Sequence, residues 1–136
     1  MTEAVLDRIE RLDPKINAFV TVTPELAREQ AQAAERAYRD GNAGALAGVP
    51  WLLKDLGIYL KGTVTTGGSV FFRDDVATFD STLVERYRRG GLVIFGKTAA
   101  PEFGQTPTTE SRLWGPTRNP WNLEHTPGGS SGGAAA

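Results

Sequence analysis

The spacing of apolar and polar residues predicts three helices. In residues 2–12 the apolar side chains fall on one face of a helix and the charged ones on the other. Asp13-Pro14 predicts the end of this helix, because a residue before proline disfavours helical backbone. Thr23-Pro24 predicts the start of a second helix, since threonine caps helices and proline suits their first position. This helix runs to about Asp40, where Gly41 suits the residue after a helix.

A third, long helix is predicted to begin near Asp80-Ser81-Thr82 and to end at Gly90-Gly91. Thr82 and Glu85 fit a capping box, with Asp80 or Ser81 as alternative caps.

Apolar runs between the helices predict strands. Residues 47–53 form one run, which ends at Lys54-Asp55, and residues 92–95 form a continuous run typical of a strand buried on both faces. Helices alternate with apolar strands, so the fold class is α/β. Three shorter stretches are an apolar segment of undefined type, a further short strand and a glycine-threonine loop: 16–22, 58–60 and 62–69.

Composition excludes several classes of function. The net charge of -1 gives no reason to expect nucleic acid or an anionic membrane as a partner. The chain has no cysteine and a single histidine, His125, which excludes thiolate chemistry and a multi-histidine metal site. Residues 1–13 lack the plan of a signal peptide, and no apolar run approaches the roughly 20 residues that span a bilayer. The expected location is the cytoplasm, and no cofactor or metal is implied.

Residues 104–136 differ from the rest of the chain. They hold four charged residues, four prolines and six glycines. Such a long stretch, poor in charge and rich in turns, is expected to line a cleft rather than to form a solvated linker. Trp114 and Trp121 are expected to pack in the core, with a place in a cleft wall as the alternative. The final Ala-Ala-Ala predicts a helix that has only begun, which suggests a fragment.

Two motifs in the chain are misleading. Residues 91–98 satisfy the pattern of a phosphate-binding P-loop, but the four middle residues are large and apolar and form the predicted strand itself. Residues 128–132 match the G-x-S-x-G nucleophile elbow, which requires a preceding strand and a histidine that follows the serine. Here two prolines precede the motif and His125 lies before the serine. Neither interpretation is retained, and His125 is expected to be an exposed loop residue.

Two simpler interpretations exist for the polar residues that remain. Lys54 at the end of a strand could reach water along its aliphatic stem, and Gly-Gly-Ser-Ser-Gly-Gly could be a flexible linker. A linker, however, seldom leads directly into Ala-Ala-Ala.

The chain resembles the amidase signature family over nearly its whole length. The resemblance depends on the order of five motifs: Gly48-Val49-Pro50 through Lys54-Asp55; Thr65-Thr66-Gly67-Gly68-Ser69; Gly96-Lys97-Thr98 with Pro101-Glu102-Phe103-Gly104; Gly115-Pro116-Thr117 with Asn119-Pro120-Trp121-Asn122; and residues 127–133. Each motif alone is weak, whereas the five in this order are specific. The resemblance implies a central mixed sheet flanked by helices and a Ser–cisSer–Lys triad.

Carried over by motif position, Lys54 is the triad lysine and Ser130 is the middle serine, behind a cis peptide bond after Gly129. Gly128, Gly129, Ser131 and Gly132 support the loop, and Ser131 is expected to hydrogen-bond within it. Gly104 and Gln105 fall where family members contact substrate. The nucleophilic serine and the oxyanion hole are expected a couple of dozen residues further on. Residues 1–136 are thus expected to be the N-terminal portion of one amidase-signature domain, inactive by itself.

The chemistry of the implied relay requires an uncharged lysine. A lysine accepts a proton only when neutral, and its reference pKa is about 10.4, so an apolar site has to lower that pKa. The residues before Lys54, Val49-Pro50-Trp51-Leu52-Leu53, are of the kind that provide such a site. Asp55 would oppose the change if it contacted the ammonium group. Its carboxylate is therefore expected to point elsewhere and to cap backbone N–H groups.

The implied partner is a small-molecule amide, with neither nucleic acid nor a membrane and with a homodimer as one alternative. Ala99 stands where the family usually has asparagine, and residues 99–103 differ from the amidotransferase component that amidates tRNA-bound Glu or Asp, which favours a free-standing amidase. Residues 115–133 are similar to hydrolases of the 6-aminohexanoate cyclic dimer. Three alternatives therefore stay open: the A-type component of a glutamyl/aspartyl-tRNA amidotransferase, a cyclic-dimer hydrolase, and a non-catalytic binding protein on this fold.

Overall fold

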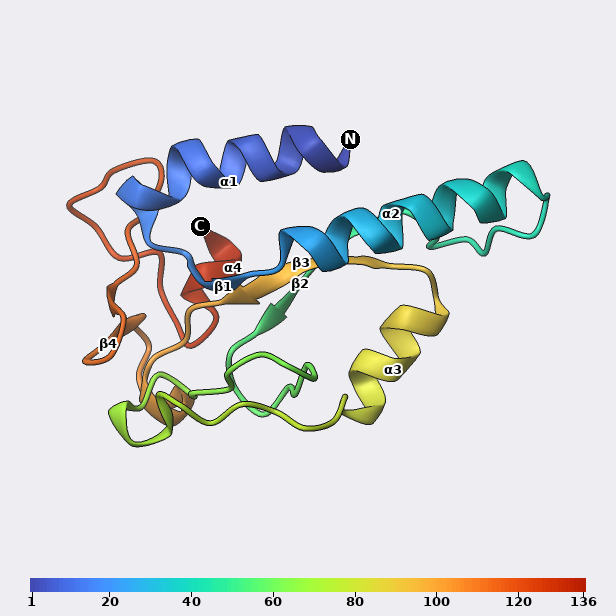
Figure 1. Ribbon diagram of the computed structural model, residues 1–136. Helices are drawn as coiled ribbons and strands as arrows, with labels where there is room; N and C mark the ends of the chain where they lie inside the picture. Colours follow the sequence, from blue (N-terminus) through green and yellow to red (C-terminus); the bar gives the residue numbers. More distant parts are fainter.

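The central strand of the sheet is β3 (Val93–Thr98), and all six of its residues are buried. It pairs antiparallel with β1 (Phe19–Val22) and parallel with β2 (Pro50–Lys54), which gives the strand order β1-β3-β2. The computed structural model describes residues 1–136 (Figure 1). The predicted α/β class, with a mixed sheet flanked by helices, is confirmed.

Helices cover both faces of this sheet: α1 (Thr2–Ile16), α2 (Pro24–Arg39) and α3 (Thr82–Arg89). Side chains alternate across a strand, so β3 contributes to two clusters. Val93 and Phe95 pack with Ala27 of α2 and with the apolar face of α1. Ile94 points the other way and packs with Leu53 and with Val84 of α3. Each face of the sheet therefore has its own apolar core.

The first helix extends beyond the predicted end at Asp13-Pro14, so that boundary is wrong. Pro14 lies within the last turn of α1, and Asn17 ends the helix in the left-handed conformation with φ 55°. The Asp13 carboxylate accepts hydrogen bonds from the backbone N–H groups of Ala18 and Phe19, at 2.7 and 3.0 Å. Asp13 thus fixes the turn from α1 into β1 rather than closing the helix.

Several other boundaries differ from the prediction. The strand predicted at 47–53 is shifted to Pro50–Lys54, residues 58–60 form no strand, and α3 has 8 residues instead of being long. Neither Thr23 nor Ser81 makes a side-chain cap, and the Thr23 hydroxyl instead donates to the Ile94 carbonyl at 3.3 Å. A tertiary contact therefore replaces the local cap at Thr23, whereas the buried Ser81 hydroxyl has no hydrogen-bond partner.

The charge-poor C-terminal segment folds against the rest of the chain. A 3-10 turn, η2 (Glu102–Gly104), leads into it. The segment then contains a short hairpin of β4 (Glu110–Ser111) and β5 (Gly115–Pro116), and one final turn of helix, α4 (Gly132–Ala135). Asn17 joins it to the end of α1, because its side chain donates to the Trp114 carbonyl and its own carbonyl accepts from the Thr117 hydroxyl. Trp114 is half-buried, whereas Trp121 is 95% exposed, so the prediction of core packing is wrong for Trp121.

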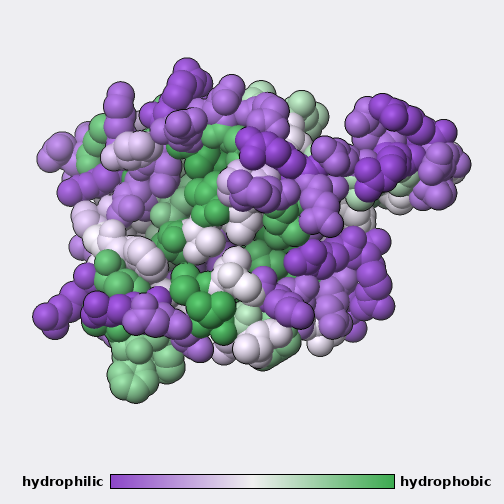
Figure 2. Space-filling model, in the orientation of Figure 1, coloured by the Kyte–Doolittle hydropathy of each residue, from purple (hydrophilic) through white to green (hydrophobic).

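The surface reflects this arrangement. Apolar residues gather at the centre of the face shown in Figure 2, and hydrophilic residues surround them and cover the C-terminal part of α2. No helix has the length and apolar character that crossing a membrane requires. A 3-10 turn, η1 (Val70–Phe72), lies in the glycine-rich region that connects β2 to α3.

Candidate active site

Lys54 occupies the last position of β2. The strand is parallel to β3, so the carboxyl ends of both strands lie at the same edge of the sheet, with Lys54 opposite Thr98. The backbone N–H of Asp55 donates to the Thr98 carbonyl at 3.0 Å, and the Thr98 hydroxyl donates to the Leu53 carbonyl at 3.2 Å. These two bonds, one on each side of Lys54, fix its main chain.

Ser130 lies in the turn that leads into α4. The Thr109 hydroxyl donates to the Gly128 carbonyl at 2.9 Å and accepts from the Gly132 N–H at 3.0 Å, so one side chain bridges the turn. At Gly129, a Cβ atom would lie 2.7 Å from the Thr108 carbonyl oxygen, which leaves room for no side chain. The peptide bond between Gly129 and Ser130 is cis, as the resemblance implied.

The fold brings Lys54 and Ser130 together across 76 positions of sequence. Lys54 Nζ donates to Ser130 Oγ at 2.8 Å. Lys54 is half-buried, and this burial lowers the pKa of its amine below the ordinary value. No carboxylate lies within ion-pair distance of Lys54. A lysine with a lowered pKa, in contact with a serine hydroxyl, can exchange a proton with it.

Gly104 lies beside this pair. A Cβ atom at Gly104 would lie 3.6 Å from Ser130 Oγ and 2.7 Å from a methyl group of Leu56, and its φ of 68° suits glycine. A side chain at this position would therefore collide with Leu56 beside the serine hydroxyl. Gln105 is exposed, and its side chain donates to the Phe103 carbonyl at 3.2 Å.

A buried ion pair lies next to Lys54, and sequence reasoning missed it. Asp55 and Lys97 are both fully buried, and Lys97 Nζ lies 2.9 Å from Asp55 Oδ1. The Asp55 carboxylate also accepts from the N–H and the hydroxyl of Thr66. The expectation that Asp55 points away from Lys54 and accepts from backbone is confirmed, but its charged partner was not foreseen.

The remaining candidates take no part in the contact between Lys54 and Ser130. The Ser131 side chain is exposed and makes no hydrogen bond, so the expectation that it bonds within the loop is wrong; its carbonyl accepts from the N–H groups that begin α4. His125 is exposed, as expected. Residues 93–98 form the central strand, which agrees with the interpretation of this segment as a strand rather than a P-loop. No group of three or more acidic or histidine side chains is arranged to hold a metal ion.

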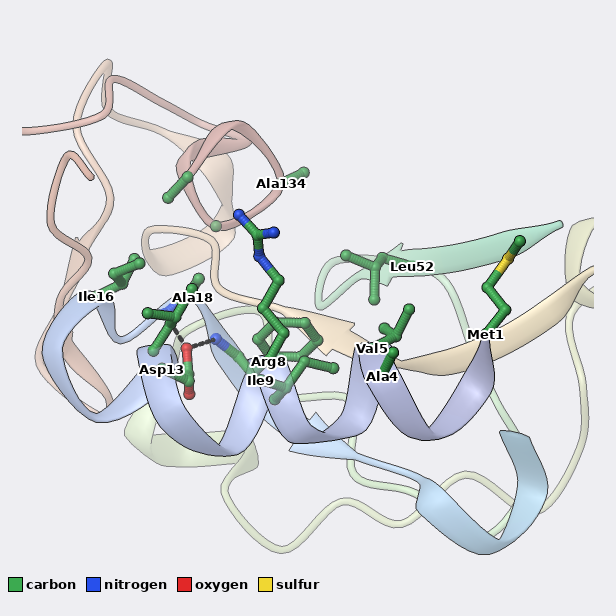
Figure 3. A pocket seen from close by; sticks show the side chains of 14 residues that line it. Met1, Ala4, Val5, Arg8, Ile9, Asp13, Ile16, Ala18, Leu52 and Ala134 are labelled. Atoms are coloured by element: carbon green, nitrogen blue, oxygen red, sulfur yellow. Dashed lines mark hydrogen bonds between the residues drawn. The ribbon is translucent and has the colours of Figure 1, made fainter. Parts of the chain in front are cut away.

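An apolar groove of about 440 Å³ lies between α1, β1, β2 and α4 (Figure 3). Val5, Ile9 and Leu52 line it, together with Gly133 and Ala134 of α4. Its one acidic side chain, that of Asp13, accepts hydrogen bonds from the two backbone N–H groups that follow α1. Apart from the Arg8 guanidinium the groove offers apolar surface, with no nucleophile or free base, and the candidate site is the pair Lys54 and Ser130.

Comparison with known proteins identifies the family. The sequence model of the Amidase family matches residues 1–136, and this chain belongs to the amidase signature family. The A-type component of glutamyl-tRNA(Gln) amidotransferase from Acinetobacter baumannii (strain AYE) is 46% identical over 136 residues, which are 100% of this chain and 27% of that protein.

Two solved structures are similar to the fold. One is a bacterial aryl acylamidase of the amidase signature family, with a TM-score of 0.92 and 41% identity over 99% of this chain and 28% of that one. The other is 6-aminohexanoate cyclic dimer hydrolase complexed with substrate, with a TM-score of 0.88 and 39% identity over 98% and 26% of the two chains. The chain thus spans about a quarter of the length of these relatives.

Proposed function

We propose that residues 1–136 form the N-terminal portion of a cytoplasmic amidase, which hydrolyses a carboxylic acid amide through an acyl-enzyme. Lys54 is its base and Ser130 its proton-relaying serine. The observation that supports this most directly is the 2.8 Å hydrogen bond between Lys54 Nζ and Ser130 Oγ. Membership of the amidase signature family supplies the reaction class.

The proton path follows from the contact. Neutral Lys54 accepts the hydroxyl proton of Ser130, and Ser130 Oγ accepts the proton of a second serine as that serine attacks the amide carbonyl. The C–N bond then breaks, the amine leaves with a proton returned through Ser130, and water hydrolyses the acyl-enzyme to the acid. Burial of Lys54 serves this path, because a lowered pKa increases its neutral fraction near neutral pH.

The nucleophilic serine and its oxyanion hole lie outside residues 1–136 in this scheme. Gly104 lies beside Ser130, and Gly104 and Gln105 contact the substrate in this scheme. The 136-residue chain alone then hydrolyses no amide. Ser130 as the nucleophile itself is the competing scheme, since a lysine and a serine in contact can form a dyad.

The experiment compares two proteins with an acyl anilide as substrate. One is the 136-residue chain, and the other is a chimera in which it replaces the matching segment of the aryl acylamidase. We expect no turnover by the first and turnover by the second, with a loss of at least about 100-fold in the chimera for Lys54→Met and for Ser130→Ala. Turnover by the isolated chain, lost on Ser130→Ala, would instead make Ser130 the nucleophile.

A second candidate is the A-type component of an amidotransferase. The 46% identity to the Acinetobacter protein favours it, and that identity extends over the whole of this chain. The two candidates share the Lys54 and Ser130 chemistry, including hydrolysis of the acyl-enzyme by water. They differ in the fate of the leaving group, because an amidotransferase passes the released ammonia to the amino acid on tRNA. Glutamine-dependent amidation of tRNA by the protein with co-purified partners supports the second candidate, whereas turnover of free amides without partners supports the first.

A further inference from the structure

Lys97 is a fully buried cation in the middle of the central sheet. Its ammonium group lies within hydrogen-bond distance of three acceptors: Asp55 Oδ1 at 2.9 Å, the Val64 carbonyl at 2.8 Å and the Thr65 hydroxyl at 2.6 Å. Three N–H donors and three acceptors satisfy the group completely. Burial lowers the pKa of Lys97, and the Asp55 carboxylate opposes that change.

Asp55 has a structural task that depends on its charge. Its two oxygens accept from Thr66, whose hydroxyl in turn accepts from the Gly68 N–H at 3.1 Å and from Trp114 Nε1 at 3.0 Å. The carboxylate thereby connects the end of β2 to the glycine-threonine loop and to the C-terminal segment. A neutral side chain could not accept all of these bonds in the same geometry, because an amide offers a single acceptor oxygen.

The same carboxylate would oppose the role of Lys54 as a base. Asp55 follows Lys54 directly, and a buried negative charge there would stabilise the Lys54 ammonium. Among the other charged groups of the surrounding elements, Asp75 acts on Lys97, and Glu102 accepts a hydrogen bond from the Ser69 hydroxyl at 2.7 Å. Lys97 is thus the cation that directly balances Asp55.

We propose that Lys97 is a positioning residue that neutralises Asp55, so that Asp55 can organise the loops around the site without holding its neighbour Lys54 in the charged form. This assignment depends on the proposed function, because an uncharged Lys54 matters only if it serves as a base. Side chains alternate along extended backbone. Lys54, at the end of β2, contacts Ser130, whereas Asp55, the next residue, contacts Lys97.

The test measures the titration of Lys54 in the 136-residue chain by NMR of ¹³Cε-labelled lysine, with the Lys54 signal assigned by Lys54→Met. We expect Lys97→Met to raise the Lys54 pKa by about one unit, because the Asp55 charge is then unbalanced. Asp55→Asn should lower it by about one unit, because the Lys97 charge is then unbalanced. The double variant should return it to within about 0.3 of the parent value.

Opposite changes that cancel in the double variant support the assignment, and every other pattern overturns it. General loosening of the fold would move Lys54 in the same direction in both single variants. Arg88→Met is the matched control, because it breaks the ion pair with Asp80 (2.8 Å) in another part of the molecule and should leave the Lys54 pKa unchanged.

Amide spectra establish that each variant is folded. If Lys97→Met does not fold, the comparison of Asp55→Asn with the double variant still isolates the Lys97 charge, and the Lys54 pKa must be higher in the double variant. The measurement is independent of turnover. Failure of the hydrolase assay with these pKa changes present would therefore refute the proposed function and leave the electrostatic coupling intact.

Discussion

Gly129→Ala is expected to destabilise the fold through a single added methyl group. The Cβ atom would lie 2.7 Å from the Thr108 carbonyl oxygen, 2.8 Å from the Thr108 carbonyl carbon and 2.9 Å from that of Pro107. All three are backbone atoms, so no rotamer change can relieve the contact. The backbone has to move either at residues 107–108 or in the turn around Gly129 that carries Ser130. We expect the turn to move, because it is the smaller of the two segments.

The size of the effect follows from what must move. Forcing extra methyl groups into well-packed regions costs typically 1–3 kcal/mol, and we expect the upper part of that range because the opposing atoms are main chain. The bridge formed by Thr109 across the turn adds to the cost, since moving Gly129 strains the bonds to Gly128 and Gly132. Displacement of the turn also separates Lys54 Nζ from Ser130 Oγ.

The assay is urea unfolding followed by tryptophan fluorescence, with two glycine controls. Gly44→Ala meets no atom closer than 4.0 Å and should change the free energy of unfolding by less than about 1 kcal/mol. Gly62→Ala has open space but a φ of 82°, so its cost of roughly 1–2 kcal/mol reports backbone strain alone. A Gly129→Ala variant that loses no more free energy of unfolding than Gly44→Ala would show that the turn accommodates the methyl group without steric cost.

Three further outcomes follow from the same contacts. Thr109→Val removes the hydroxyl that bridges Gly128 and Gly132 and should cost about 1–3 kcal/mol in urea unfolding, whereas a near-zero change would mean that water replaces the bridge. Trp121→Ala should change stability by less than about 0.5 kcal/mol, because the side chain is 95% exposed; a larger loss contradicts its exposure. Burial lowers the Lys54 pKa in the folded chain. At pH values between this lowered pKa and the ordinary value of 10.5, the unfolded chain therefore carries more protons at Lys54 than the folded chain does. The contribution of Lys54 to stability should therefore be complete above that value and be lost as pH falls through the folded pKa. A parent stability that does not rise relative to Lys54→Met as the pH approaches 10.5 from below would contradict this sign.

The pattern of apolar residues predicted the layers of the fold better than its boundaries. The continuous run at 92–95 identified the central strand, because burial on both faces leaves no polar position in the run. Pro14 misled the prediction of α1, since Asp13 holds the turn that follows with its side chain, and a local rule does not see that contact. The short strand β1 depends on pairing with β3, which the sequence of residues 16–22 does not reveal.

The contact at the candidate site could be inferred only through motif order. Nothing in the local sequence of Lys54 or of the glycine-serine turn indicates that positions 76 apart lie within a hydrogen bond of each other. The turn also depends on Thr109, which has no sequence signal that relates it to Gly128. Trp121 was predicted to pack in the core but is exposed. The sequence of a turn-rich segment does not reveal whether an aromatic side chain faces the core or the solvent.

The buried ion pair, in contrast, was within reach of sequence reasoning. The strand Val93–Thr98 is buried throughout, so a lysine at its fifth position cannot reach water and must find an anion. Asp55 directly follows the neighbouring apolar strand, and parallel strands bring their carboxyl ends to one edge of the sheet. A lysine inside one buried strand and an aspartate at the end of the next therefore predict each other. The two lysines differ in the same respect, because Lys97 has an anionic partner that favours its charged form, whereas Lys54 contacts a hydroxyl and has no anion within ion-pair distance.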